Sequence, residues 1–163
     1  MGNVHHESPR AWRSPGLLIG LGLGGFADGI LLHQLLQWHN MFSAIHPPST
    51  LAAMQLNMRW DGLFHVLTWM LTLVGVVQLW RAGMRGSLPR SGRHFTGQLV
   101  LGWGLFNLIE GLLDHQLLGI HHVREGPTWL AYDMAFLGLG GLGLLLLGLV
   151  LSRRPRDRGG AAV

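Results

Sequence analysis

The chain of 163 residues contains no cysteine. It therefore has no disulfide, no thiolate metal site and no cysteine-ligated iron–sulfur cluster. Lysine is absent as well, and all twelve basic residues are arginines. Most of these arginines flank apolar stretches instead of forming a basic patch, so we expect no nucleic-acid partner. Any metal ion bound by this chain must have nitrogen and oxygen ligands.

Charged residues are scarce. They make up 12% of the chain, whereas a soluble domain has about 25%. Hydrophobic residues make up 48%, and the mean hydropathy is +0.31. The composition predicts a membrane protein that is surrounded by a lipid bilayer.

Four apolar stretches are each close to the ~20 residues that a helix needs to cross the hydrocarbon core. They predict transmembrane helices over residues 15–38, 60–80, 95–119 and 129–151. We therefore expect an all-α four-transmembrane-helix bundle over residues 15–152, between a disordered cytoplasmic head (1–14) and a disordered basic cytoplasmic tail (153–163). The first stretch lacks a small-residue cleavage site, so it does not resemble a removable signal peptide.

The arginines predict the orientation of these helices. The loops after the first and third helices hold only Arg59 and Arg124, whereas the head, the middle loop and the tail hold the other arginines. By the positive-inside rule, both termini and the middle loop are cytoplasmic and the two arginine-poor loops face outward. We expect a multi-pass protein of the bacterial inner membrane with these two loops in the periplasm.

One pattern occurs twice inside the apolar stretches. An acidic residue is followed by glycine, three further residues, His-Gln-Leu-Leu, two residues and a second histidine, first at residues 28–39 and again at 110–121. The two copies are 82 residues apart and end the first and third helices, which run in the same direction. This internal repeat predicts two helical hairpins related by a pseudo-twofold axis along the membrane normal.

Both copies end at the outer level, where the second and fourth helices begin with further polar residues. The predicted cluster comprises Asp28, His33, His39, Asp61, His65, Glu110, Asp114, His115, His121, His122 and Asp133. A charged carboxylate near the centre of a membrane helix costs ~2.5–3.5 kcal/mol on insertion scales. Because the spans contain no arginine, neutralisation must come from histidine protons, from protonation of the acids or from a bound cation. Histidine and carboxylate together are ligands of Zn, Fe, Mn or Cu(II).

Ideal α-helical geometry, with about 100° per residue, divides the cluster between helix faces. It predicts that His33 and His115 point about 120–140° away from the acids of their own helices. Asp28 and His39 project within about 40° of one another, as do Glu110, Asp114 and His121. Each of the two helices would then present two polar faces to different neighbours. In the second helix, Asp61 and His65 are four residues apart and could chelate together, or the aspartate could orient the histidine.

Our leading hypothesis is one or two divalent transition ions near the outer face. The expected ligands are His33, His65 and His115 with some of the acids, and the remaining histidines would close the site or support it. Other interpretations stay open: carboxylate–imidazole pairs as structural contacts between helices, a membrane metalloenzyme acting as a hydrolase or metal-dependent oxidoreductase, and a haem held by His33 and His115. A channel is disfavoured because no polar path crosses the membrane. The sequence does not show whether the protein is an enzyme. It also does not show whether the protein forms a homodimer.

Residues 25–39, 61–65 and 107–125 resemble those of a family of predicted bacterial inner-membrane proteins, the domain-of-unknown-function family number 2243. The resemblance covers nearly all of the chain between its two tails. It implies no particular activity. Genes of such proteins often lie beside that of the membrane copper-delivery factor of cytochrome oxidase assembly, so it implies respiratory copper handling, with respiratory-complex assembly factors as partners. Ligand chemistry alone favours Zn or Fe over Cu(I), because carboxylates are hard ligands and thiolates are absent.

Overall fold

The computed structural model of the chain describes residues 14–88 and 91–153. The predicted head and tail lie outside the described residues, except for Ser14 and Arg153. The described part is all-helical and consists of four helical rods joined by loops. The rods are α1 (Pro15–Asp28) continued by η2 (Gly29–Leu35); α2 (Leu51–Met84); α3 (Gly92–Glu110) continued by η3 (Gly111–Leu117); and α4 (Trp129–Ala135) continued by η4 (Phe136–Gly143) and α5 (Leu144–Ser152).

Three of the rods begin at a hydroxyl side chain that caps the helix. The Ser14 hydroxyl accepts a hydrogen bond from the amide of Leu17, and Pro15 occupies the first turn, where no amide donor is needed. Thr50 and Ser91 cap α2 and α3 in the same way. These caps satisfy amides that would otherwise lack a partner, so they determine where each rod starts.

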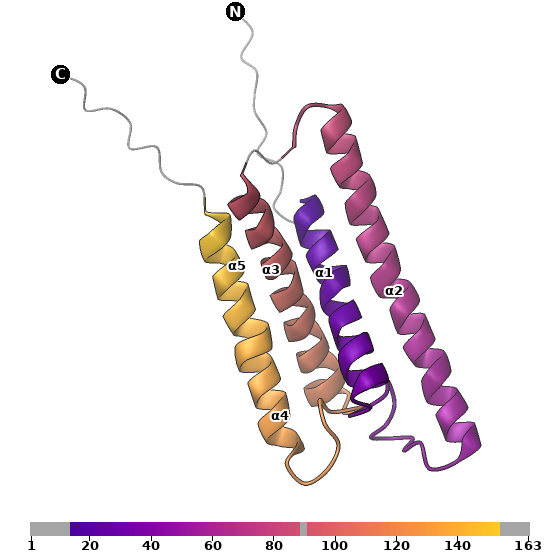
Figure 1. Ribbon diagram of the computed structural model, residues 1–163. Helices are drawn as coiled ribbons and strands as arrows, with labels where there is room; N and C mark the ends of the chain where they lie inside the picture. The colour runs from indigo at the N-terminus through magenta and orange to yellow at the C-terminus, as the bar shows by residue number, and fades with distance from the viewer. Residues whose placement is uncertain (1–13, 89–90, 154–163) are drawn as a thin grey trace, which may run out of the picture.

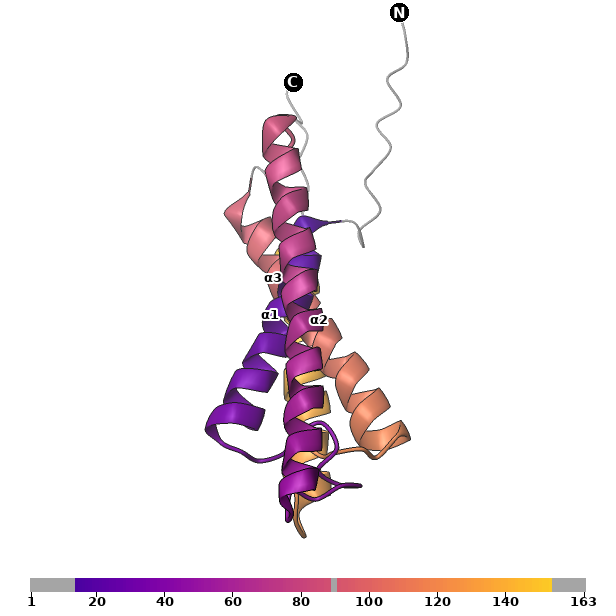
Figure 2. The same cartoon turned by 90° about the vertical axis from the view of Figure 1, so that its right-hand side faces the viewer.

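The four rods lie in the order α2, α1, α3, α5, with α1 and α3 at the centre (Figure 1). α1 packs against α2 and α3, and α3 packs against α1 and α5. In the perpendicular view, α1 and α3 cross near their middle and diverge toward one end, where the lower parts of α2 and α4 lie between them (Figure 2). All four rods therefore contribute residues to a shared interior at that end.

Glycines form the contact where α1 and α3 cross. A side chain at Gly20 would meet the backbone of Leu99, and a side chain at Gly102 would meet the backbone of Leu17. In lipid, small residues let two helix backbones approach closely enough for van der Waals packing to hold them. Gly20 and Gly102 therefore allow α1 and α3 to pack closely at this crossing.

Membrane-spanning helices are supported for three of the four rods. By length and composition, the described helices suited to cross a membrane are Pro15–Leu35, Leu51–Met84 and Trp129–Ser152. The α3–η3 rod is not among the described helices that meet these criteria of length and composition. Its sequence carries more polar groups, among them Arg93, Gln98 and Asn107.

The second rod is longer than the apolar stretch of residues 60–80 that predicted it. Its 34 residues extend about 50 Å and begin at Leu51. The polar first turns are held by Asn57, which accepts a hydrogen bond from the amide of Phe42 and donates to the carbonyl of His46. Hydropathy marks only the lipid-facing part of a helix, so it missed these turns. Asp61 consequently lies in the third turn of α2 instead of the first.

We expect Gly20→Ala and Gly102→Ala each to lower the free energy of unfolding by about 1–3 kcal/mol, because the added methyl group presses on a neighbouring backbone. Gly62→Ala is the matched control, since nothing lies within 4 Å of a side chain placed there. It should be neutral or stabilising by up to ~1 kcal/mol through helix propensity. Denaturation of the detergent-solubilised protein, followed by circular dichroism, measures all three. Equal stability of the three variants would contradict the crossing contact.

Candidate metal centre

The two motif copies are wound as π-helices. In η2 the amide of Leu36 donates to the carbonyl of Leu31 at 2.8 Å, and in η3 the amide of Leu118 donates to Leu113 at 2.8 Å. A π-helix joins residues five apart, whereas an α-helix joins residues four apart. Side chains five positions apart therefore come onto the same face.

This winding overturns the predicted divergence of acid and histidine within each motif. His33 lies five residues after Asp28, and its Nε2 is 3.1 Å from the Oδ2 of that aspartate. His115 lies five residues after Glu110, and its Nε2 is 3.1 Å from the glutamate Oε1. The expectation of separate faces was wrong because it assumed 100° per residue throughout.

Two residues after the end of each π-helix, one residue has left-handed backbone geometry. Gln37 has φ 50° and Gly119 has φ 57°. The chain then reverses and brings the next histidines, His39 and His121, back over the helix end. Their rings stack with centroids 4.6 Å apart.

Six buried side chains from the two motifs converge at this place. Ligand atoms of His33, His39 and His121 lie within 4.8 Å of one another, as do those of Glu110, His115 and His121, and those of Asp28, His39 and Glu110. The four imidazoles are each no more than 2% exposed. The Nε2 atom of His121 is 3.1 Å from Glu110 Oε1, the same oxygen that faces His115. Two carboxylates thus lie among four imidazole rings.

The outer nitrogen of each imidazole faces an oxygen that accepts hydrogen bonds. His39 Nδ1 donates to the carbonyl of Val123 at 2.8 Å, and His121 Nδ1 donates to the carbonyl of Met41 at 3.1 Å. His33 Nδ1 donates to Asp61 Oδ1 at 3.0 Å. The Nδ1 of His115 lies 3.5 Å from Asp133 Oδ1 without a hydrogen bond. A neutral imidazole with its proton on Nδ1 directs its Nε2 lone pair at Asp28 and Glu110, whereas a doubly protonated one donates to these carboxylates, as the Nε2 contacts of His115 and His121 with Glu110 allow.

Asp61 and Asp133 link these histidines to the loops that cover the site. Asp61 also accepts from the amide of Met41 and from the side chain of Asn40. Asp133, which is fully buried, accepts from the amide of Val123, and its second oxygen accepts from Gln116 and His122. Both aspartates therefore hold a histidine and a loop backbone together.

The centre contains polar atoms that the protein itself leaves unpaired. Within the described ranges, both oxygens of Asp28, the Nε2 of His39 and the Oε2 of Glu110 are buried without a hydrogen-bond partner. Burial holds the pKa of His39 well below its usual range, and the adjacent His121 and His33 lower it further. His39 is thus a neutral imidazole with a free lone pair. Either a cation or protons on the imidazole nitrogens would satisfy the lone pairs and carboxylates that face one another here.

Five of the eleven predicted residues lie outside the convergent groups: Asp61 and Asp133, which face His33 and His115 from behind, and three others. His65 is half-buried and donates from Nδ1 to the backbone carbonyl of Asp61, so the predicted Asp61–His65 side-chain pair does not form. His122 donates to Asp133 and stacks on Trp129. Asp114 is half-buried one residue before His115.

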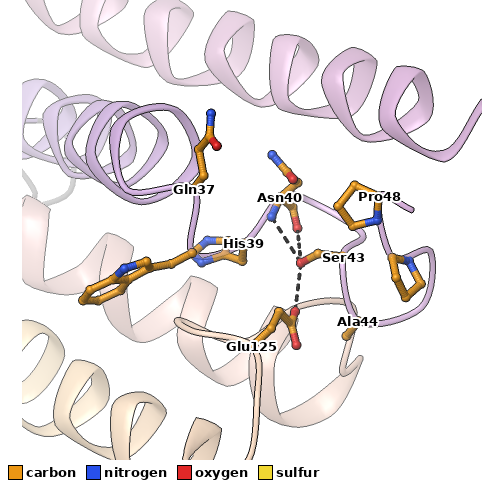
Figure 3. Close-up of a pocket in the computed structure, with 9 residues that line it drawn as sticks. Gln37, His39, Asn40, Ser43, Ala44, Pro48 and Glu125 are labelled. Carbon is orange, nitrogen blue, oxygen red and sulfur yellow. Dashed lines mark hydrogen bonds between the residues drawn. The ribbon is translucent and has the colours of Figure 1, made fainter. Parts of the chain in front are cut away.

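A pocket of about 380 Å³ lies over the centre, between the loop after η2 and the loop after η3. His39 lines it, and so do Asn40, Ser43 and Glu125. The Ser43 hydroxyl donates to Glu125 at 2.8 Å and accepts from the amide of Asn40 at 3.1 Å, as Figure 3 shows. Sequence reasoning missed Glu125 and Ser43, although both follow a motif histidine by four residues.

Asp133→Asn should lower the free energy of unfolding by about 1–3 kcal/mol, because the amide nitrogen would face donors where Oδ2 now accepts from Gln116 and His122. Asp114→Asn makes the same chemical change at a half-buried carboxylate to which no described residue donates a hydrogen bond, so it should cost less. Thermal unfolding of the metal-stripped protein compares the two. A similar loss in both variants would mean that the Asp133 network contributes little.

No curated protein and no solved structure matches the chain. A family model described as "Predicted membrane protein (DUF2243)" matches residues 15–155. A match over that much of the chain establishes membership: this chain belongs to the DUF2243 family of predicted membrane proteins.

Proposed function

We propose that the protein binds divalent transition metal ions at the centre formed by the two motifs. The observation that carries this proposal is the common direction of four imidazoles. Their Nδ1 atoms face carbonyl or carboxylate oxygens, so their Nε2 lone pairs are aimed at Asp28 and Glu110. A cation at this place would satisfy these lone pairs and the unpaired carboxylate oxygens together. The proposed ligands are Asp28, His33, His39, Glu110, His115 and His121.

Zn and Fe fit this donor set best, and Cu(II) fits it better than Cu(I), because the donors are imidazoles and carboxylates. Six candidate ligands exceed the four of a tetrahedral ion. One six-coordinate ion or two ions bridged by the carboxylates would use all of them. Asp61 and Asp133 would orient His33 and His115 from behind, as carboxylates do at many histidine metal sites.

We also propose four transmembrane helices related in pairs by a pseudo-twofold axis. Matching contacts support this: Gly20 on Leu99 has its counterpart in Gly102 on Leu17, with 82 residues between corresponding positions. Likewise, His39 bonds Val123 and His121 bonds Met41. The α3–η3 rod can cross the bilayer because its polar groups face α1 and α5, as the Asn107 side chain does when it donates to Gly140 of η4.

In this arrangement the centre would face the periplasm from the inner membrane, with both termini cytoplasmic, since the arginine-rich segments lie at the opposite helix ends. A centre near the outer surface could hold copper or another metal for respiratory oxidase assembly.

A metalloenzyme is the second candidate, and the pocket beside His39 is the observation that favours it, since catalysis needs access for a substrate.

A bis-histidine haem is less favoured. Both nitrogens of His33 already face aspartates at 3.0 and 3.1 Å.

Purified protein expressed with added metal should contain about one ion per chain or more by elemental analysis. Glu110→Gln should lower the affinity at least ~100-fold, because it removes a ligand charge, and Asp61→Asn should lower it ~10–100-fold by loosening His33. His46→Ala is the control, because His46 is exposed on the same outer side. Less than about a tenth of an ion per wild-type chain would overturn the proposal.

The topology can be tested without background labelling, because the chain has no cysteine. Ser49→Cys and Ser87→Cys form a matched pair of exposed serines at opposite ends of α2. In spheroplasts, an impermeant thiol reagent should label the variant at 49 readily and the variant at 87 only after permeabilisation. The reverse pattern would contradict the proposed orientation, and equal labelling would contradict the crossing.

A further inference from the structure

Two interlocked loops cover the outer side of the candidate metal centre. The amide of Ala44 donates to the carbonyl of Ile120, and the amide of Glu125 donates to the carbonyl of Trp38. The bond from His39 to Val123 joins the same two loops. An ion that reaches the buried centre from the outer side must pass through this cover.

The pocket between the loops extends from the exposed surface to His39, a residue of the centre. Its rim is exposed at Pro47, Pro48 and Glu125, while His39 at its inner wall is 2% exposed. His39 is the residue that both lines this pocket and belongs to the convergent ligand groups. Its Nε2 atom is buried and has no hydrogen-bond partner among the described residues.

The charges around the pocket favour a cation. Glu125 is the single acidic residue in the loop segments 36–50 and 118–128. Its Oε1 is held by the Ser43 hydroxyl at 2.8 Å. The neighbouring Arg124 forms no salt bridge with Glu125 among the described residues, since its guanidinium donates to the Tyr132 hydroxyl and lies over the rings of Trp38 and Tyr132.

The remaining polar groups of the pocket are neutral and mostly offer oxygen. The backbone carbonyl oxygen of Asn40 lies 3.0 Å from the Ser43 hydroxyl oxygen, and the Gln37 side chain also lines the pocket (Figure 3). Carboxylate, hydroxyl and carbonyl oxygens suit a cation that keeps most of its water. A volume of about 380 Å³ has room for an ion with its hydration shell, at about 30 Å³ per water molecule.

We propose that this pocket is a transit site for a hydrated divalent cation, in which Glu125 binds the ion before His39 takes it into the buried centre. The inference rests on the proposed metal-binding function. It assigns Glu125 to the path of the ion and not to its final coordination. Changes in the path should therefore alter the rates of uptake and release by the same factor and leave the affinity unchanged.

Co²⁺ is a suitable probe, because its visible absorption reports binding to imidazole. Stopped-flow mixing with the metal-stripped, detergent-solubilised chain measures uptake, and an excess of chelator measures release. Glu125→Gln should slow both rates about tenfold, with the bound Co²⁺ per chain unchanged, and Glu125→Asp should restore them in large part. Ala44→Leu, which narrows the pocket without changing charge, should slow both rates as well.

Arg59→Gln is the charge control, because it alters an exposed charge of the outer side away from the pocket, and its rates should match the wild type. Wild-type rates in Glu125→Gln would overturn the inference. Faster release with a weaker affinity would overturn it too, since Glu125 would then be a ligand of the final site. Absence of Co²⁺ from the wild-type chain would refute the proposed function itself, whereas unchanged rates in a chain that binds Co²⁺ would refute the transit site alone.

Discussion

The structure depends on the burial of two carboxylates, Asp28 and Glu110, inside apolar helices. Water cannot solvate them there, and no arginine of the described residues contacts them. Four imidazole nitrogens surround them instead. The π-helical windings, the loops that return His39 and His121, and the aspartates behind His33 and His115 all maintain this arrangement. The proposed cation would complete its electrostatics by lying among the lone pairs and carboxylates that face one another.

The helix packing makes room for the centre at one end. Close approach at Gly20 and Gly102 lets α1 and α3 cross, and two helices that cross must diverge on either side of the contact (Figure 2). The space between the diverging ends admits Asp61 from α2 and Asp133 from α4. The small residues at the crossing therefore determine where the helices diverge, and the polar residues lie where they have diverged. The cover over the open end joins loops from both motifs, so access to the centre and its integrity depend on the same contacts.

Much of this could be predicted because the signals are local. Low charge and long apolar stretches indicated a helical membrane protein, and the repeated acid–histidine pattern identified all six convergent residues among the candidates. The angular positions of His33 and His115 could not be predicted with standard helix geometry. A π-helix is recognised from its backbone hydrogen bonds, and the sequence does not show these. The partner of Asp61 could not be predicted either. It is His33, which belongs to another rod, and not the neighbouring His65.

The sequence by itself determined the environment and the chemistry of this protein, because hydropathy and donor type are properties of individual residues and short segments. Without cysteine, and with histidines and acids repeated within apolar helices, the candidate ligands are imidazole nitrogens and carboxylate oxygens. The tertiary structure alone decided which of those side chains meet. That depends on the crossing of α1 and α3, on the winding of η2 and η3, and on two loops that close over one another, with Glu125 and Ser43 coming together from positions 82 residues apart. Such contacts depend on how segments that are far apart in the sequence pack together, so they cannot be predicted from any one segment.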